Sequence, residues 1–194
     1  MDVKRSDADV TPRGLDDALR RARAALERRP QLGLHDDAPA TARWDSRTRV
    51  VARHPNGAEL ATDMPGELGG TGDQVTPGWL FRAGFASCLA TSIAMAAALE
   101  GVALTRLEVR ASSRSDTRGV LGMNEPDGTP VYGGPTDVAL HVRIAASNVA
   151  RERLRALVDD VYRRSPVPCA VVNAVPVDVD VDVDVDIDVD IDVS

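Results

Sequence analysis

The sequence predicts a single domain of the α+β class, and three observations carry that prediction. A long apolar helix is expected over residues 77–100, and alternating apolar residues predict strands after it, over 107–111 and 138–144. A chain of 194 residues with 43% hydrophobic residues can bury one substantial core. Only 3% of the residues are aromatic, so we expect an aliphatic core, with an oligomer adding further burial.

The central helix has clear start and stop signals. Thr76 is a favourable N-cap, Pro77 suits the first helical position, and Gly101 is a plausible end. The segment between them is rich in Ala, Gly and Ser, so it should pack closely against its neighbours. Polar residues within it, including Arg82, favour a core helix over a membrane span.

The segments before this helix predict a helix and a hairpin. Thr11 and Pro12 open an amphipathic helix that runs to about Arg29. A hairpin follows, with strands over 41–53 and 58–62 joined by a turn at 54–57 that contains Asn-Gly.

The segments after the helix add strands, a long loop and two helices. The loop over 113–136 holds five glycines, and a long irregular loop often contacts a partner or serves function. Asn148 is expected to cap a second amphipathic helix, and a short helix should begin at Ser165. The expected order is α-β-β-α-β-β-α-α-β.

The C-terminal segment is a strict alternation of Val or Ile with Asp over residues 177–193. This pattern gives a strand with one β-branched face and one acidic face. We expect its first half to complete a sheet and its far end to overhang, fray or pair with another subunit. The segment holds eight aspartates, and the rest of the chain is nearly neutral, so we expect no nucleic-acid partner.

The cysteine and histidine content narrows the class of protein. The first twelve residues are polar and carry no signal-peptide pattern, so we expect a cytoplasmic protein without a membrane partner. Two cysteines in the reducing cytosol favour thiol chemistry or a transient disulfide over a structural one. The three histidines are scattered, so no metal and no cofactor is expected.

Two cysteine-containing motifs resemble those of one known family. Pro77-Gly-Trp-Leu-Phe-Arg-Ala-Gly-Phe-Ala-Ser-Cys88-Leu resembles the central helix of the OsmC/Ohr family, the osmotically inducible and organic-hydroperoxide-resistance proteins. Ser165-Pro-Val-Pro-Cys169 is similar to that family's second cysteine motif, with Ser at the cysteine position. The similarity spans roughly residues 41–180 and implies antiparallel sheets wrapped around a central helix in an intertwined homodimer.

The resemblance also implies a chemistry and assigns roles to residues. It makes Cys88 the peroxidatic cysteine, which attacks an organic hydroperoxide and becomes a sulfenic acid. It makes Arg47 the arginine that favours the thiolate, with Arg43 and Arg49 as alternatives. A thiol or dithiol reductant completes the cycle. The family's glutamate near the start of the helix falls on Gly78, and Glu67 is the only nearby acid that might replace it.

Several roles stay open at this point. Cys169 either resolves the sulfenic acid or is a buried small residue, and two prolines before it disfavour movement toward Cys88. Phe81, Phe85 and Ser165 are expected to contact the substrate. We expect an arm over 1–40, an OsmC-like domain over 41–180 and an acidic tail over 181–194. The alternative function is a non-catalytic dimer that binds an apolar small molecule between its subunits.

Overall fold

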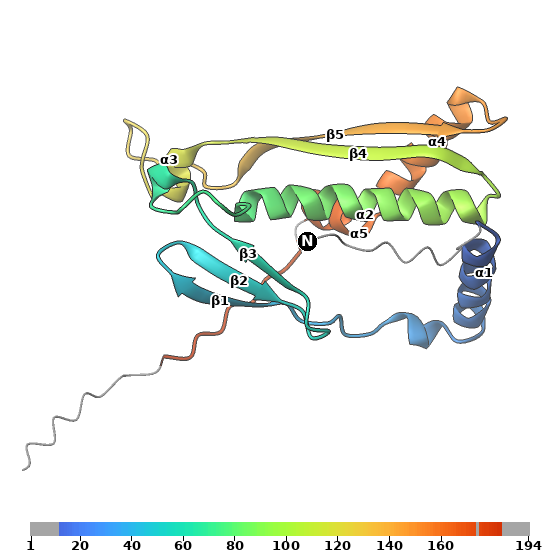
Figure 1. Cartoon of the computed structure of the whole chain (residues 1–194), viewed down its shortest axis with the longest axis horizontal. Coiled ribbons are helices and arrows are strands. Elements are labelled where there is room, and N and C mark those ends of the chain that lie inside the picture. The colour runs from blue at the N-terminus through green and yellow to red at the C-terminus, as the bar shows by residue number, and fades with distance from the viewer. Residues whose placement is uncertain (1–11, 174, 184–194) are drawn as a thin grey trace, which may run out of the picture.

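The computed structural model describes residues 12–173 and 175–183, and it confirms the α+β class (Figure 1). One antiparallel sheet contains β1 (Thr41–Ser46), β2 (Arg49–Arg53) and β3 (Glu59–Thr62) in that order. A second contains β4 (Leu104–Ser115) and β5 (Pro135–Ala146). The central helix α2 lies between the two sheets in the view of Figure 1.

Helix α2 (Pro77–Leu99) forms as the sequence predicts. The hydroxyl of Thr76 accepts a hydrogen bond from the Trp79 amide, and Pro77 occupies the first helical position. Gly101 then adopts a φ of +70°, a left-handed conformation that glycine takes without strain and that ends the helix.

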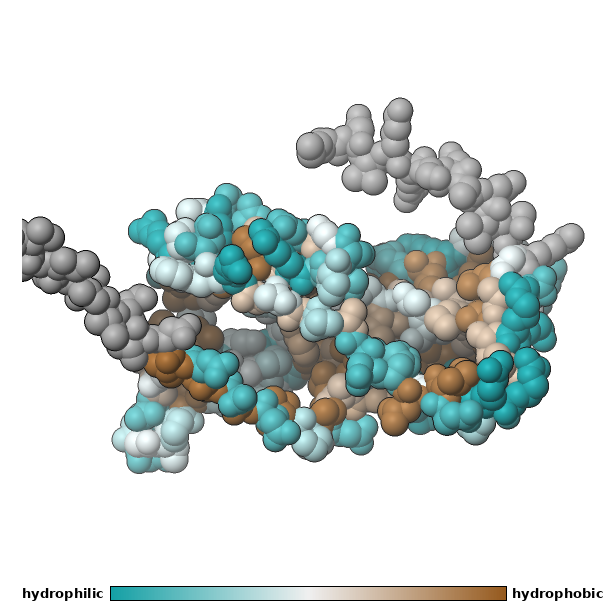
Figure 2. Space-filling model, turned by 90° about the horizontal axis from the view of Figure 1, so that it is seen from below, coloured by the Kyte–Doolittle hydropathy of each residue, from teal (hydrophilic) through white to brown (hydrophobic). Residues whose placement is uncertain are grey.

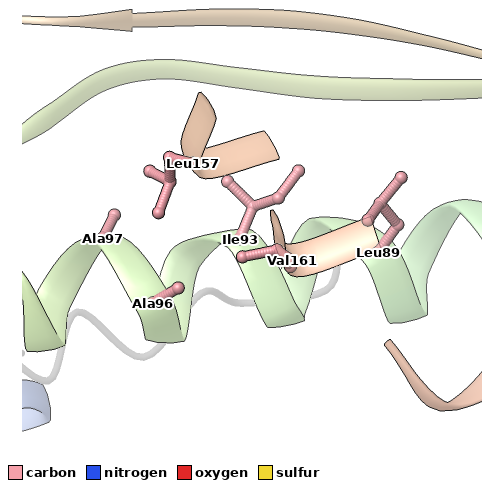
Figure 3. Close-up of a cluster of buried hydrophobic side chains, with 6 residues drawn as sticks. All are labelled: Leu89, Ile93, Ala96, Ala97, Leu157 and Val161. Atoms are coloured by element: carbon pink, nitrogen blue, oxygen red, sulfur yellow. The ribbon is translucent and has the colours of Figure 1, made fainter. Parts of the chain in front are cut away.

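The core lies between α2, the β4–β5 sheet and α4 (Arg151–Tyr162). Alternate side chains of β4 and β5 pack toward α2 and α4, and the side chains between them are exposed. The buried centre in Figure 3 consists of four α2 residues and two α4 residues: Leu89, Ile93, Ala96, Ala97, Leu157 and Val161. Small alanines let α4 approach α2 closely, so an aromatic-poor sequence still fills this centre.

Helix α2 is long and apolar enough to cross a membrane by length and composition alone. In the structure it packs against β4, α4, α5 (Pro166–Val172) and α1 (Pro12–Arg28). The guanidinium of Arg20 on α1 donates to the Leu99 carbonyl at 3.2 Å, so α1 places a cation at the C-terminal end of α2. These contacts hold one side of α2 within the fold.

The predicted hairpin differs from the structure in one respect. The predicted strand over 41–53 is two strands, β1 and β2, joined by a tight turn at Arg47 and Thr48. Arg47 takes a left-handed φ of 52°, although the segment contains no glycine that would indicate a turn. The turn at 54–57 is confirmed, with Gly57 at a φ of +90°.

Two further predictions are corrected. Asn148 does not cap α4, because it lies in the turn after β5 with a φ of 59°, and Ala150 occupies the N-cap position. Residues 175–183 pair with no strand of the described chain, so the first part of the tail does not complete a sheet within one subunit. The rest of the tail, over 184–194, lies outside the described residues.

The long loop after β4 contains one short helix, α3 (Thr117–Val120).

In the described part of the chain, one face of the β1–β3 sheet carries exposed apolar side chains. The strand register places Trp44, Val50, Ala52 and Leu60 on the same face. Trp44 is 68% exposed and Leu60 is 38% exposed. Figure 2, seen from below, shows hydrophobic residues in and around an open hollow near the middle of the molecule. The described chain therefore exposes large apolar side chains of a kind that proteins ordinarily bury.

Candidate functional site

Cys88 lies midway along α2, half-buried, and its sulfur contacts two groups from the start of α5. The Ser165 hydroxyl lies 3.4 Å from Cys88 Sγ, and the Val167 amide donates to the same sulfur at 3.4 Å. Ser165 is 0% exposed, and its hydroxyl also lies 3.2 Å from the Ser92 hydroxyl. Cys88, Ser92 and Ser165 therefore form a continuous polar cluster inside an apolar packing layer.

The sequence at the start of α5 explains why Val167 reaches the sulfur. Pro166 and Pro168 carry no N–H, so Val167 is the only one of the first three helical residues with an amide to donate. Ser165 occupies the N-cap position, but its side chain does not cap α5. Its hydroxyl instead bonds to α2, and the start of α5 is thereby oriented toward Cys88.

The thiol of Cys169 has a different partner. Its sulfur donates to the Arg163 carbonyl at 3.1 Å, at the end of α4. It lines a small cleft of about 250 Å³ together with Tyr162 and Pro168. Both cysteines are free thiols, and the structure does not bring their sulfurs into contact.

Phe81 and Phe85 lie on α2, about two turns and one turn before Cys88 respectively. Their rings pack edge to face, with centroids 5.9 Å apart, and Phe85 is 3% exposed. Together with Leu89 they form part of the wall of a cleft of about 780 Å³ between α2, β5, α4 and α5. The cleft is thus next to the segment that carries Cys88, although Cys88 does not line it.

The three candidate arginines lie in the β1–β3 sheet, and none is in contact with Cys88 within one subunit. Arg47 is at the exposed tip of the β1–β2 turn, where its carbonyl accepts from the Trp44 indole at 2.9 Å. Arg43 is exposed on β1. Arg49 bonds to Asp63 at 3.2 Å and also to Asp73. Its charge is therefore already neutralised by two carboxylates.

Asp63 is a buried carboxylate that sequence reasoning missed. It is 2% exposed, and it accepts hydrogen bonds from the Thr48 hydroxyl and from the Thr71 hydroxyl and amide. These hydrogen bonds, that from Thr48 foremost, hold the pKa of Asp63 well below its usual range. A side chain at Gly70 would clash with the Met64 carbonyl at 1.8 Å, so only glycine lets the loop close around the carboxylate. Asp63 thus ties the glycine-rich loop to the β1–β2 turn.

The lowered pKa of Asp63 should affect the stability of the folded protein at acid pH. A carboxylate with a lowered pKa in the folded state stabilises the protein at a pH above its unfolded value of about 4. That contribution begins to fall as the pH drops below the unfolded value, and it is fully lost only below the folded value. We expect the melting temperature of Asp63→Asn to fall less than that of the parent between pH 5 and pH 3, measured by circular dichroism. Asp17→Asn, at an exposed position on α1, is the control and should behave as the parent. Parallel curves for Asp63→Asn and the parent would contradict the assignment.

The remaining candidate residues are apart from the thiol. Glu67 is exposed in a short 3₁₀ helix (Gly66–Leu68) and contacts neither Cys88 nor Arg47. Gly78 leaves its position without a carboxylate. In the described part of the chain, no three His, Cys, Asp or Glu side chains gather in a way that could hold a metal ion. Ser92 was missed by the sequence analysis, although its spacing of four from Cys88 places both on one helical face.

The cluster at Cys88 can stabilise a nucleophilic sulfur. The Val167 N–H and the Ser165 hydroxyl are placed so that they can also hold an oxygen bonded to this sulfur, as in a sulfenic acid. The sulfur lies on the central helix, where the packing layer limits access by water.

The chain is similar to one known family in sequence and in fold. Residues 70–180 match the family model described as OsmC-like protein. No curated protein matches the sequence. An OsmC-like protein from Mycoplasma pneumoniae has a similar structure, with a TM-score of 0.60 and 18% identity over 73% of this chain and 91% of that one.

Two other solved structures extend the similarity. An OsmC-like protein of unknown function from Vibrio cholerae aligns with a TM-score of 0.56 and 13% identity, over 70% of this chain and 94% of that one. An organic hydroperoxide resistance protein from Elizabethkingia anophelis, with bound thiocyanate, aligns with a TM-score of 0.54 and 22% identity. The alignment covers 71% of this chain and 89% of that one. At these identities the structures establish a shared fold. Because the family model covers more than half of the sequence, the chain belongs to the OsmC-like protein family.

Proposed function

We propose that this protein is a thiol peroxidase that reduces organic hydroperoxides through Cys88 and relies on an external thiol for its own reduction. The observation that carries the proposal is the pair of contacts from Val167 and Ser165 to the Cys88 sulfur. Both contacts come from the start of α5, so the half-buried sulfur has polar partners on a second helix as well as apolar neighbours. Membership of the OsmC-like family, which includes hydroperoxide resistance proteins among its structural relatives, supports the same chemistry.

The proposed reaction has three steps. The Cys88 thiolate attacks the terminal oxygen of the hydroperoxide, the O–O bond breaks, and the alkoxide takes a proton, giving an alcohol and a cysteine sulfenic acid. A thiol then attacks the sulfenic sulfur, which releases water and forms a mixed disulfide. A second thiol attacks that disulfide, which regenerates Cys88 and leaves the oxidised reductant.

The α2 wall of the cleft beside Cys88 favours organic hydroperoxides over hydrogen peroxide. Phe81, Phe85 and Leu89 supply an apolar wall within two turns of Cys88, and the cleft of about 780 Å³ accommodates an organic group. Hydrogen peroxide has no group to bury there. Transfer of the organic group from water therefore favours the larger substrate.

An external thiol is needed because Cys169 is held away from Cys88. Its sulfur donates to the Arg163 carbonyl, and α5 begins with two prolines that resist unwinding. A disulfide requires the two Cα atoms to lie within about 7 Å and the Cβ atoms to face each other. The cytosol, rich in small thiols, is the compartment in which we expect the enzyme to act.

Oxidation of the intact protein tests this proposal. After one equivalent of cumene hydroperoxide, we expect Cys88 to carry a sulfenic acid that dimedone traps, or a mixed disulfide when a small thiol is added. Mass spectrometry of the peptides should find Cys169 still reduced. A stoichiometric bond between Cys88 and Cys169 contradicts the one-cysteine mechanism, and an unmodified Cys88 contradicts the peroxidase.

We further propose that the functional unit is a homodimer. The apolar face that carries Trp44 and Leu60 is exposed in one subunit, and the candidate arginines on that sheet are not in contact with Cys88 of the same chain. A second copy that packs against this face removes the apolar surface from water, and it can bring an arginine such as Arg47 to the neighbouring thiol.

Sedimentation equilibrium at micromolar concentration checks the assembly. We expect a mass twice that of the 20.6 kDa chain. Trp44→Glu should shift the equilibrium toward monomer, because it places a charge on the apolar face. Trp79→Glu is a matched control at an exposed tryptophan on α2. A folded monomer of the parent at this concentration contradicts the proposal.

A second candidate is a non-catalytic protein that binds an apolar small molecule. The cleft beside Phe85 favours it, because its volume suits such a ligand without any reaction. The oxidation experiment separates the two functions, since a binding protein leaves Cys88 a free thiol after treatment with hydroperoxide.

A further inference from the structure

A second cavity lies at the N-terminal end of α2, apart from Cys88. It has a volume of about 500 Å³, and it lies between the glycine-rich loop, the first turns of α2 and the loop around α3. Its walls are largely apolar, with Met64, Leu68, Phe81 and Val120 among the lining residues. Cys88 is not one of them.

One charged side chain lines this cavity. Arg82, half-buried, donates to the Ser113 hydroxyl at 3.2 Å. Within the described ranges no carboxylate lies at ion-pair distance from its guanidinium, whereas Arg49 and Arg118 each contact two acids. A half-buried cation beside apolar walls is costly unless an anion compensates it. Among the described residues, the Arg82 guanidinium therefore has no anionic partner, although it lies in a cavity that partly excludes water.

Gly78 makes the guanidinium accessible and adds a second donor. A Cβ built at Gly78 would lie 3.7 Å from Nη1 of Arg82, so any longer side chain there would occupy the space beside the guanidinium. The Gly78 amide, in the first turn of the helix, has no acceptor among the described residues. The guanidinium and the amide are thus two N–H donors at one side of an apolar cavity.

We propose that this cavity is a binding site for an amphipathic carboxylate, whose anionic head bonds to Arg82 and the Gly78 amide and whose apolar tail lies against Phe81 and Met64. A planar guanidinium matches a carboxylate with two parallel hydrogen bonds. The positive end of the α2 dipole favours the same charge. The apolar walls select against small inorganic anions, because those have no group to bury.

This site does not include Cys88, although Phe81 borders both this cavity and the cleft assigned to the hydroperoxide. Arg82 precedes Cys88 by six residues, a rise of about 9 Å along the helix. The two side chains also lie on different faces, since six residues correspond to about 600° of rotation. Binding at Arg82 does not require a reactive thiol, so the two proposals can fail separately.

Isothermal titration of the full chain with sodium octanoate, below its micelle concentration and in low salt, tests the site. We expect saturable binding with one octanoate per chain. Octanol has the same tail without the charge, and acetate has the charge without the tail. Each should bind at least about tenfold more weakly, as expected when either a charge-assisted hydrogen bond or the apolar contact is lost.

Two variants assign the binding to this cavity. Arg82→Gln removes the cation and should weaken octanoate binding about ten- to a hundredfold. Gly78→Glu leaves Arg82 in place but puts a tethered carboxylate beside it, and it should weaken binding to a similar extent. An acidic residue in the first turn favours the helix, so this variant decides the matter if Arg82→Gln does not fold.

Two controls complete the design. Arg110→Gln, on the exposed outer face of β4, removes the same charge elsewhere and should leave binding within about twofold of the parent. Cys88→Ser should bind octanoate as the parent does, whatever becomes of its peroxidase activity. The proposal is overturned if octanoate fails to saturate, if octanol binds equally well, or if Arg82→Gln and Gly78→Glu both bind as the parent.

Discussion

Cys88→Ser is expected to remove hydroperoxide consumption almost completely, with a loss of at least about a thousandfold, because an alcohol is a far weaker nucleophile than a thiolate. The hydroxyl is smaller than the thiol and can still share a hydrogen bond with Ser165, so the fold should persist. Consumption of cumene hydroperoxide with excess dithiol measures the loss, and circular dichroism checks the fold.

Cys169→Ser is the matched control for this experiment. Its hydroxyl can donate to the Arg163 carbonyl as the thiol does, and the activity with an external thiol should stay within about twofold of the parent. If Cys169→Ser loses as much activity as Cys88→Ser, the two-cysteine mechanism is restored. If Cys88→Ser keeps the parent's activity, the sulfur of Cys88 is not the nucleophile.

The central helix was predictable because its signals are local. Thr76, Pro77 and Gly101 each act through the conformation of their own backbone, so sequence alone predicts where α2 begins and ends. Pro166 and Pro168 of α5 also act through their own backbone, because proline has no N–H to donate. They leave Val167 as the one early donor, and the structure directs that donor to Cys88.

Other features were not predictable because they depend on the tertiary structure. Arg47 takes a left-handed conformation in a turn with no glycine, and this divides the predicted strand into β1 and β2. Asn148 has the composition of an N-cap, but the turn after β5 uses it in a left-handed conformation instead. Asp63 is one of many aspartates in the sequence, and only the folded loop reveals that Thr48 and Thr71 surround it.

The role of an arginine was the least accessible from sequence. Arg43, Arg47 and Arg49 are close together in the sequence, but Arg49 is held by Asp63 and Asp73, so its charge is not free to act on a thiol. Arg82 had no assigned role in the sequence pattern, because its environment combines α2 with segments more than thirty residues away along the chain. Charge pairing depends on which residues the fold brings together, and hydropathy patterns do not record it.

The position of Ser165 leads to the second large effect. Its hydroxyl is 3.4 Å from Cys88 Sγ, and Ser165 is completely buried, so a sulfur at this position would lie beside the proposed sulfenic acid. Ser165→Cys should therefore convert the one-cysteine mechanism into a two-cysteine mechanism. After one equivalent of hydroperoxide we expect the introduced cysteine to form a disulfide with Cys88 in most molecules, whereas the parent forms almost none.

Intact-protein mass spectrometry with thiol alkylation measures this conversion, since the disulfide protects both sulfurs from the alkylating reagent. Ser87→Cys introduces the same thiol on the exposed side of α2, where the Ser87 hydroxyl bonds to the Gly84 carbonyl, and it should give no disulfide with Cys88. A disulfide in both variants would indicate random oxidation of exposed thiols. Failure of Ser165→Cys to form one, in a variant that still folds, would show that the start of α5 is held too rigidly for the two sulfurs to bond. It would also mean that contact between Cys88 and Ser165 does not by itself establish a resolving position. The second sulfur would then need a freedom of movement that Pro166 and Pro168 deny it.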